Sequence, residues 1–243
     1  MKHISILVPK KAILGSLEGS RQLFTQVNQF FLAKGEPAPF KVQLVGLTRE
    51  TLLSGGCFTA NTDVLLDDVK HTDLIIIPAF DGEIPNALEL NKEFIPWLVK
   101  QYHNGAEIAS LCMGAFILAS TGLLAGKKCA THWLAANEFK KMFPDVNLVT
   151  EKIITDEQGL YSSGGAFSYL NLILYLIEKH TGREMAVRVV IAERACRGEP
   201  VEPGIPANGN GRGRPDRTFG GDGQVVPQDA GDPASHRASV EAA

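Results

Sequence analysis

The feature that most constrains this chain is a single turn, centred on Cys112, between two short apolar segments. Glu107–Leu111 is mostly apolar and follows the turn-forming pair Asn104-Gly105, which predicts a buried β-strand. Gly114–Ser120 is rich in alanine, leucine and isoleucine, which predicts a helix packed on a sheet. Cys112 is therefore expected where a strand passes directly into a helix.

Small residues flank this cysteine two positions before and after it, Ser110 and Gly114. The pattern Ser-x-Cys-x-Gly has the spacing of a nucleophile elbow with sulfur in place of the usual hydroxyl. Free N–H groups at the start of the following helix would lower the pKa of the Cys112 thiol. The alternative is a buried structural cysteine, because free cysteine is among the most buried residue types. These residues alone leave both interpretations open.

The composition is that of an ordinary folded chain. Its 243 residues suffice for one large domain or two small ones, and 44% hydrophobic residues allow a sizeable core. The formal net charge of −3 gives no general basic field for nucleic acid. The apolar run after Met1 is too short for a signal peptide, and no run approaches a membrane span.

The cysteines argue for a reducing compartment. The four of them, Cys57, Cys112, Cys129 and Cys196, are widely spaced and lack a Cys-x-x-Cys or Cys/His ligand pattern. We therefore predict a cytoplasmic protein without a disulfide framework, a metal or another cofactor.

Strand and helix patterns alternate through most of the chain, which predicts an α/β fold with a mostly parallel sheet covered on both faces. Strands are expected at residues 3–8, 40–47, 74–77, 107–111, 129–131, 148–154 and 160–162. Helices are expected at residues 19–34, 91–103, 114–120, 133–143, 167–180 and 184–194, with a hairpin or loop at 48–63 and a short helix at 64–69. Functional groups in such a sheet gather at the carboxyl ends of the strands.

The composition changes abruptly near Arg197. The last 47 residues contain nine glycines and six prolines, and Phe219 is their only aromatic residue. Such a segment buries too little apolar surface to offset its ordering entropy. We therefore predict a folded domain at 1–195 and a disordered Gly/Pro/Arg-rich tail at 196–243. The few arginines of the tail favour a solvated linker over a nucleic-acid arm.

A cysteine nucleophile needs a base within reach, and His132 is the best candidate because it follows the next strand at the same sheet edge. The oxyanion donors would be the Met113 N–H and an N–H of the loop after residue 77, near Gly82. Glu18, in the segment after the first strand, is the nearest candidate acid. Trp133, next to the histidine, is assigned to the same pocket.

Several motifs in order resemble the ThiJ/PfpI branch of the class I glutamine-amidotransferase-like superfamily. They are Ser110-Leu-Cys-Met-Gly-Ala-Phe-Ile-Leu-Ala, Thr121-Gly-Leu-Leu-Ala-Gly-Lys-Lys, Ala130-Thr-His-Trp, Tyr161-Ser-Ser-Gly-Gly-Ala and the segment 172–184. Residues 2–190 are most similar to the amidotransferase-like N-terminal domain of AraC-type transcriptional regulators. The resemblance implies a flavodoxin-like α/β sandwich, usually dimeric, with Cys112 and His132 at the family's cysteine and histidine positions.

The same resemblance exposes departures from the catalytic members. Ser16, a further pocket residue, falls where isocyanide hydratases carry an acid, and Glu18 lies two residues on. Met113 stands where those hydratases have threonine and the peptidase-like members have histidine. Pro78-Ala-Phe-Asp-Gly replaces the usual Pro-Gly-Gly, so Gly82 is the only glycine of that loop.

Two functions follow as expectations. The first is a dimerising, ligand- or redox-sensing domain of an AraC-type regulator, truncated before its DNA-binding domain by a frameshift or rearrangement near residues 185–194. Such a chain would bind no specific DNA and no membrane. The alternative is a cysteine-dependent small-molecule enzyme, hydratase-like or glyoxalase-like, that uses Cys112 as nucleophile with His132 or Glu18 for proton transfer.

Overall fold

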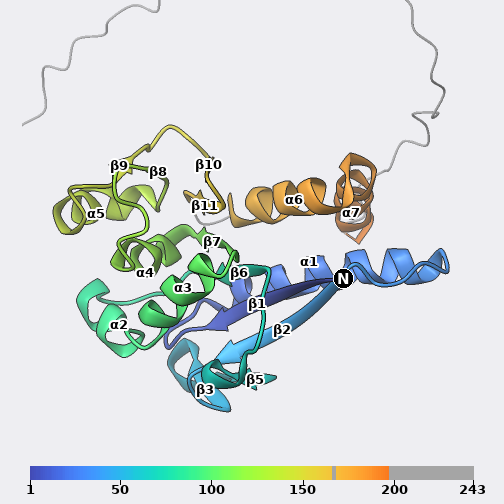
Figure 1. Cartoon of the computed structure of the whole chain (residues 1–243), viewed down its shortest axis with the longest axis horizontal. Coiled ribbons are helices and arrows are strands. Elements are labelled where there is room, and N and C mark those ends of the chain that lie inside the picture. The colour runs from blue at the N-terminus through green and yellow to red at the C-terminus, as the bar shows by residue number, and fades with distance from the viewer. Residues whose placement is uncertain (166–167, 197–243) are drawn as a thin grey trace, which may run out of the picture. The chain divides into compact units, whose positions relative to one another are not determined.

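The computed structural model describes residues 1–165 and 168–196, and its central element is a seven-stranded sheet (Figure 1). The strand order is β10-β11-β7-β6-β1-β2-β5, and every neighbouring pair is parallel except β10 with β11. The bounds are β1 (Lys2–Val8), β2 (Phe40–Gly46), β5 (Val64–Leu65), β6 (Leu74–Ile77), β7 (Glu107–Leu111), β10 (Ile154–Glu157) and β11 (Leu160–Ser163). The predicted mostly parallel sheet is confirmed.

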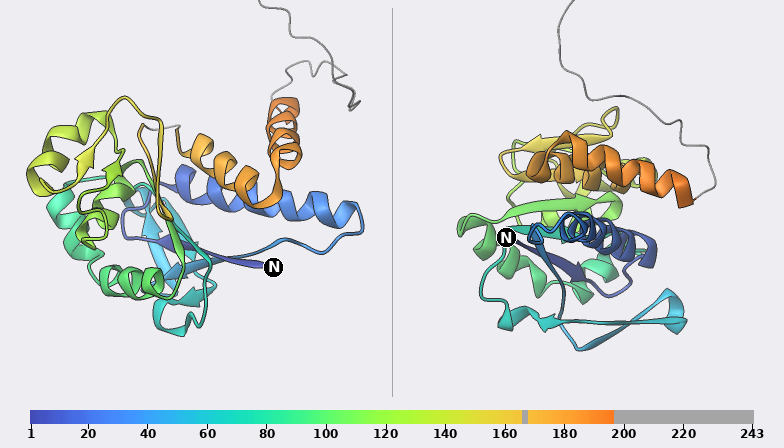
Figure 2. Two further views of the ribbon diagram at one scale, coloured as in Figure 1. Left: turned by 45° about the horizontal axis from the view of Figure 1, so that its top comes forward. Right: turned by 90° about the vertical axis from the view of Figure 1, so that its right-hand side faces the viewer.

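Helices cover both faces of this sheet, as predicted. They are α1 (Leu14–Ala33), α2 (Ile84–Leu90), α3 (Phe94–His103), α4 (Ala115–Ser120), α5 (Ala136–Met142), α6 (Ser168–Thr181) and α7 (Arg183–Cys196). The alternation of side chains along β6 shows how the core divides: Ile75 and Ile77 pack toward α2, α3, α4 and α5, whereas Leu74 and Ile76 pack toward α1, α6 and α7. Figure 2 shows α1 and α6 side by side on the second face.

Two small sheets complete the described chain. The predicted hairpin at 48–63 is present as the antiparallel pair β3 (Glu50–Leu53) and β4 (Phe58–Asn61). The second pair is parallel, β8 (Lys128–Cys129) with β9 (Asn147–Leu148), and stands outside the main sheet. The strand predicted at 129–131 therefore ends two residues early, and the one predicted at 148–154 is divided between β9 and β10.

Several helix boundaries differ from the prediction. Helix α1 begins at Leu14 rather than at Gly19, because that glycine serves close packing instead of a helix start. A Cβ on Gly19 would lie 2.8 Å from the Tyr169 hydroxyl oxygen on α6. Helix α2, with Pro85 in its first turn, was not predicted, and the helix predicted from residue 91 begins at Phe94.

Short 3-10 turns replace parts of two other predicted helices. Leu66–Asp68 forms such a turn after β5, where one helix at 64–69 was expected. Trp133–Ala135 forms another before α5, where one helix at 133–143 was expected. No helix within the described ranges combines the length and apolar character that crossing a membrane requires. The predicted tail, apart from the end of α7, and residue 167 of the predicted sixth helix lie outside those ranges.

A buried polar cluster joins the end of α6 to the start of β7. The His180 Nε2 atom lies 3.4 Å from a Glu107 carboxylate oxygen, and neither atom has a hydrogen-bond partner among the described residues. Burial lowers the pKa of His180 from its ordinary 6.5, and the positive charges of Lys2 and Lys179 act in the same direction. The negative charges of Glu107 and Asp73 oppose this shift without reversing it.

This shift predicts a loss of stability in mild acid. Since the unfolded chain binds the His180 proton more tightly than the folded one, the stability conferred by neutral His180 is complete above pH 6.5. This contribution to stability is lost as the pH falls from 6.5 through the lower pKa that His180 has in the folded chain. Urea unfolding of the parent and His180→Gln across this range measures the effect. The variant should show a flatter pH dependence, whereas exposed His103→Gln should follow the parent; equal slopes for all three would contradict the prediction.

Candidate functional site

Cys112 lies at a strained turn between β7 and the 3-10 turn Cys112–Gly114 that leads into α4. Its φ is +53°, a left-handed conformation that costs a non-glycine residue on the order of 1 to 3 kcal/mol. The Thr131 hydroxyl donates a hydrogen bond to the Cys112 carbonyl oxygen at 3.1 Å. The backbone therefore has the strand, turn and helix order that the sequence predicted, held by a contact from the segment after β8.

The Cys112 thiol is not activated in this structure. The residue is only 4% exposed, and burial raises the pKa of the thiol above its ordinary 9.0. The backbone N–H of Met113 hydrogen-bonds to the sulfur and offsets part of this rise. The thiol is consequently protonated at neutral pH. The expected lowering of the Cys112 pKa was wrong, because desolvation outweighs what the short following helix supplies.

Cys112 borders a largely apolar cavity of about 540 Å³ at the carboxyl ends of the parallel strands. Its volume falls within the range of small-molecule sites, on the order of 300 to 1,000 Å³. The lining residues are Ile13, Gly15, Ser16, Ala79, Phe80, Asp81, Gly82, Cys112, Met113, His132, Leu134, Ala135, Glu138 and Tyr169. Five predicted site residues are thus brought together: Ser16, Gly82, Cys112, Met113 and His132.

Glu18 and Trp133 are not among them. Glu18 follows Ser16 by two positions in α1, which is a rotation of about 200° around the helix axis. The two side chains therefore lie on opposite faces of the helix. Its carboxylate is 42% exposed and makes an ion pair with Arg21 at 2.6 Å. Trp133 is 68% exposed and stacks on the His132 ring with centroids 5.8 Å apart. The structure therefore places neither Glu18 nor Trp133 in the lining of this cavity.

His132 lines the same cavity as Cys112 but is hydrogen-bonded elsewhere. Its Nδ1 atom accepts the Leu134 N–H at 3.2 Å and caps the 3-10 turn before α5. This bond requires a lone pair on Nδ1, so the proton of the neutral ring is on Nε2. Within residues 1–165 and 168–196 no hydrogen bond joins the imidazole to the Cys112 sulfur. The histidine therefore does not act as a base on the thiol in this conformation.

Ser16 occupies one backbone donor of the loop after β6. Its hydroxyl donates to the Ile13 carbonyl at 2.9 Å and accepts the Ala79 N–H at 3.1 Å. The N–H of Asp81, two residues after Ala79, donates to the Lys11 carbonyl oxygen at 3.1 Å. Two amide donors of the loop after β6 are therefore used in hydrogen bonds to the segment after β1.

Glu138 and Tyr169 are pocket residues that the sequence did not reveal. Glu138 lies in the first turn of α5, and Tyr169 lies in the first turn of α6. Both belong to helices that the sequence predicts. The position of these helices over the strand ends could not be predicted. No local motif marks either residue, and only the packing of α5 and α6 could identify them.

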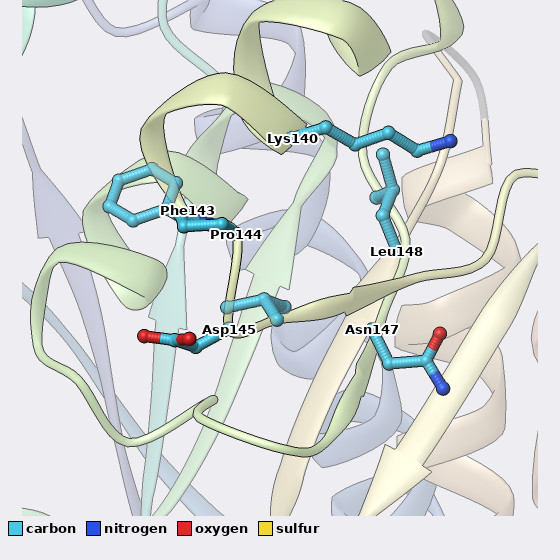
Figure 3. Close-up of a pocket in the computed structure, with 7 residues that line it drawn as sticks. Lys140, Phe143, Pro144, Asp145, Asn147 and Leu148 are labelled. Atoms are coloured by element: carbon cyan, nitrogen blue, oxygen red, sulfur yellow. The ribbon is translucent and has the colours of Figure 1, made fainter.

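A second hollow, of about 530 Å³, lies away from Cys112 at the connection between α5 and β9. Figure 3 shows Lys140, Phe143, Pro144, Asp145, Asn147 and Leu148 around it. The residues that line it include no cysteine, histidine or serine. Nowhere in the described ranges do three or more histidine, cysteine, aspartate or glutamate side chains form a group that could hold a metal ion.

The fold and the position of the cavity define a flavodoxin-like α/β protein with its site at the strand ends. Residues 24–179 match the DJ-1/PfpI family, and the chain belongs to that family. The resemblance inferred from the motifs is therefore confirmed.

One of two similar proteins is a transcriptional regulator, and the other is an enzyme. The chain is 30% identical to the HTH-type transcriptional regulator CdhR of Pseudomonas aeruginosa over 138 residues, which cover 57% of this chain and 40% of that protein. It is 24% identical to an isonitrile hydratase of Pseudomonas putida over 142 residues, 58% of this chain and 59% of that enzyme. The chain therefore spans less than half of the regulator's length.

A solved structure supports the same fold. The crystal structure of an AraC family transcriptional regulator from Pseudomonas putida superimposes with a TM-score of 0.66 at 16% sequence identity. The match covers 79% of this chain and all of that one. At this identity the likeness establishes the fold alone.

Proposed function

We propose that this domain is the small-molecule-sensing module of an AraC-type transcriptional regulator, and that Cys112 is a wall of its binding cavity rather than a nucleophile. The observation that carries the proposal is an apolar cavity of about 540 Å³ around a thiol that stays protonated. The similarity to CdhR supports the regulatory role.

Several groups that catalysis would use are occupied. A cysteine nucleophile requires a base in contact with it and donors for the developing oxyanion. His132 accepts a hydrogen bond from Leu134, and the Ala79 N–H donates to Ser16. The Met113 N–H hydrogen-bonds to the sulfur itself. Binding needs none of these groups, so the arrangement favours a sensor over an enzyme.

Protection of Cys112 from alkylation tests the binding role. Exposed Cys57 should react first with iodoacetamide near neutral pH, and Cys112 slowly, because its thiol is buried and protonated. A small neutral apolar probe such as cyclohexylmethanol should slow Cys112 further without affecting Cys57, as peptide mass spectrometry would show. If no apolar probe changes the rate at Cys112, the cavity is not a binding site.

The proposal places the protein in the cytoplasm as a homodimer that binds no membrane. It is supported by the unpaired Cys57, Cys112 and Cys129 in the described part of the chain, and by the family resemblance. A redox role for Cys112 is less favoured, because oxidation requires an accessible thiolate.

An enzyme of the hydratase type is the second candidate, and one observation favours it. Glu138 and His132 both line the cavity of Cys112, so an acid and a base lie in one compartment with a thiol. If this candidate is correct, isonitrile hydration should disappear in Cys112→Ala and fall in Glu138→Gln. Glu18→Gln is the matched control and should leave turnover unchanged, because Glu18 faces away from the cavity. Turnover that survives Cys112→Ala excludes the candidate.

A further inference from the structure

We propose that the cavity selects a small organic cation, with an ammonium or amidinium group at Glu138 and an apolar body directed toward Cys112. This inference rests on the proposed binding function and adds the chemical class of the ligand. Three features of the site support it: the few free donors of its lining, the exposed carboxylates that border it, and the position of Glu138 between two hollows.

The lining of the cavity offers few free donors for an anion. Four backbone N–H groups of its lining residues already have acceptors: Ala79 donates to Ser16, Asp81 to Lys11, Leu134 to His132, and Met113 to the Cys112 sulfur. The remaining surface there comes largely from apolar side chains. A carboxylate or phosphate that entered would lose water and find little in its place, whereas a hydrocarbon group would gain burial.

The mouth of the cavity carries negative charge. Asp81 and Glu138 line it, are exposed, and make no hydrogen bond or ion pair through their carboxylates with any described residue. The lining includes no lysine or arginine. Two basic groups are near: the Lys11 ammonium lies beside Gly82, next to Asp81, and Lys141 lines the neighbouring hollow. The Glu138 carboxylate makes no ion pair with either of them, so it is the position that favours a cation.

Glu138 lies at the junction of two hollows. It belongs to the Cys112 cavity and also to an adjoining hollow of about 560 Å³ formed with Pro85, Asn137, Lys141 and Met142. Its carboxyl group therefore borders both the space next to Cys112 and the adjoining hollow. Glu138 is also in the first turn of α5, where a negative charge stabilises the helix. The test must therefore separate ligand recognition from this helix effect.

Three probes of matched shape separate the alternatives: cyclohexylmethylamine, cyclohexylmethanol and cyclohexanecarboxylate. Titration calorimetry on the full chain near neutral pH should show the amine binding on the order of tenfold more tightly than the carboxylate, with the alcohol between them. The preference should shrink at high salt, because the carboxylates at the mouth are exposed.

Variants at the carboxylate then identify its role. Glu138→Gln should reduce the affinity for the amine to about that for the alcohol while leaving the alcohol unaffected, an outcome that loss of helix stability cannot produce. Exposed Glu36→Gln, outside the cavity, is the control and should preserve the preference for the amine. Equal binding of amine and alcohol overturns the charge inference alone, whereas binding of none of the three overturns the sensing function as well.

Discussion

Replacing Gly114 with alanine is expected to destabilise the domain by about 3 kcal/mol, and replacing it with valine by more. A Cβ at this position would lie 2.5 Å from the Ile77 carbonyl oxygen and 2.8 Å from that of Pro78. Both atoms belong to the backbone where β6 ends, so neither can rotate away as a side chain could. The φ of Gly114 is −57°, which any residue adopts. The glycine is therefore required by close approach and not by backbone conformation.

Gly15→Ala is the matched control, because no atom lies within 4 Å of a Cβ built there. Gly15 is inside α1, where alanine is favoured by up to about 1 kcal/mol. The free energy of unfolding, measured in urea, should therefore fall for Gly114→Ala and rise for Gly15→Ala. If Gly114→Ala is as stable as the parent, β6 does not approach the Cys112 turn as closely as described here.

Phe116→Ala should cost about 3 to 5 kcal/mol, the usual result of removing a fully buried aromatic ring. Phe116 is in α4, directly after the Cys112 turn, and has no solvent exposure. Its ring makes edge contacts with Phe139 on α5 at 5.0 Å and with Phe143 at 6.1 Å between centroids. It therefore joins the helix that follows Cys112 to the one that carries Glu138.

Phe58→Ala provides the comparison for this loss. Phe58 is 52% exposed on β4 and should change the free energy of unfolding by about 1 kcal/mol or less. Both variants would be measured by denaturant unfolding, with the slope of the transition checked for change. A loss at Phe116 no greater than at Phe58 would mean that α4 and α5 do not share one core.

The α/β alternation and the turn at Cys112 could be read from the sequence because both are local. Four consecutive aliphatic residues ending at Pro78 define a central strand wherever they occur, and all four are fully buried in β6. Ser110, Cys112 and Gly114 mark a strand that enters a helix with small neighbours. His132 could be assigned to the same edge because carboxyl ends of strands converge there.

Acid groups could not be assigned in this way. Glu18 was chosen for its nearness in sequence to Ser16, but the phase of α1 directs it to Arg21 and solvent. Glu138 was overlooked although it lines the cavity, because its place depends on how α5 lies against the strand ends. The state of the Cys112 thiol also depends on tertiary burial, which outweighs the N–H group that the local motif supplies.

The family, the alternation of strands and helices, and the position of the cysteine can be predicted from the amino-acid sequence, because they follow from short-range patterns of apolar and small residues. The side chains that share the cavity, the amides that are already hydrogen-bonded, and the need for glycine at Gly114 beside the end of β6 are known only from the folded structure. Those properties depend on contacts between segments far apart in the chain. Such contacts set the chemistry of Cys112, a protonated wall of a cavity whose mouth carries negative charge.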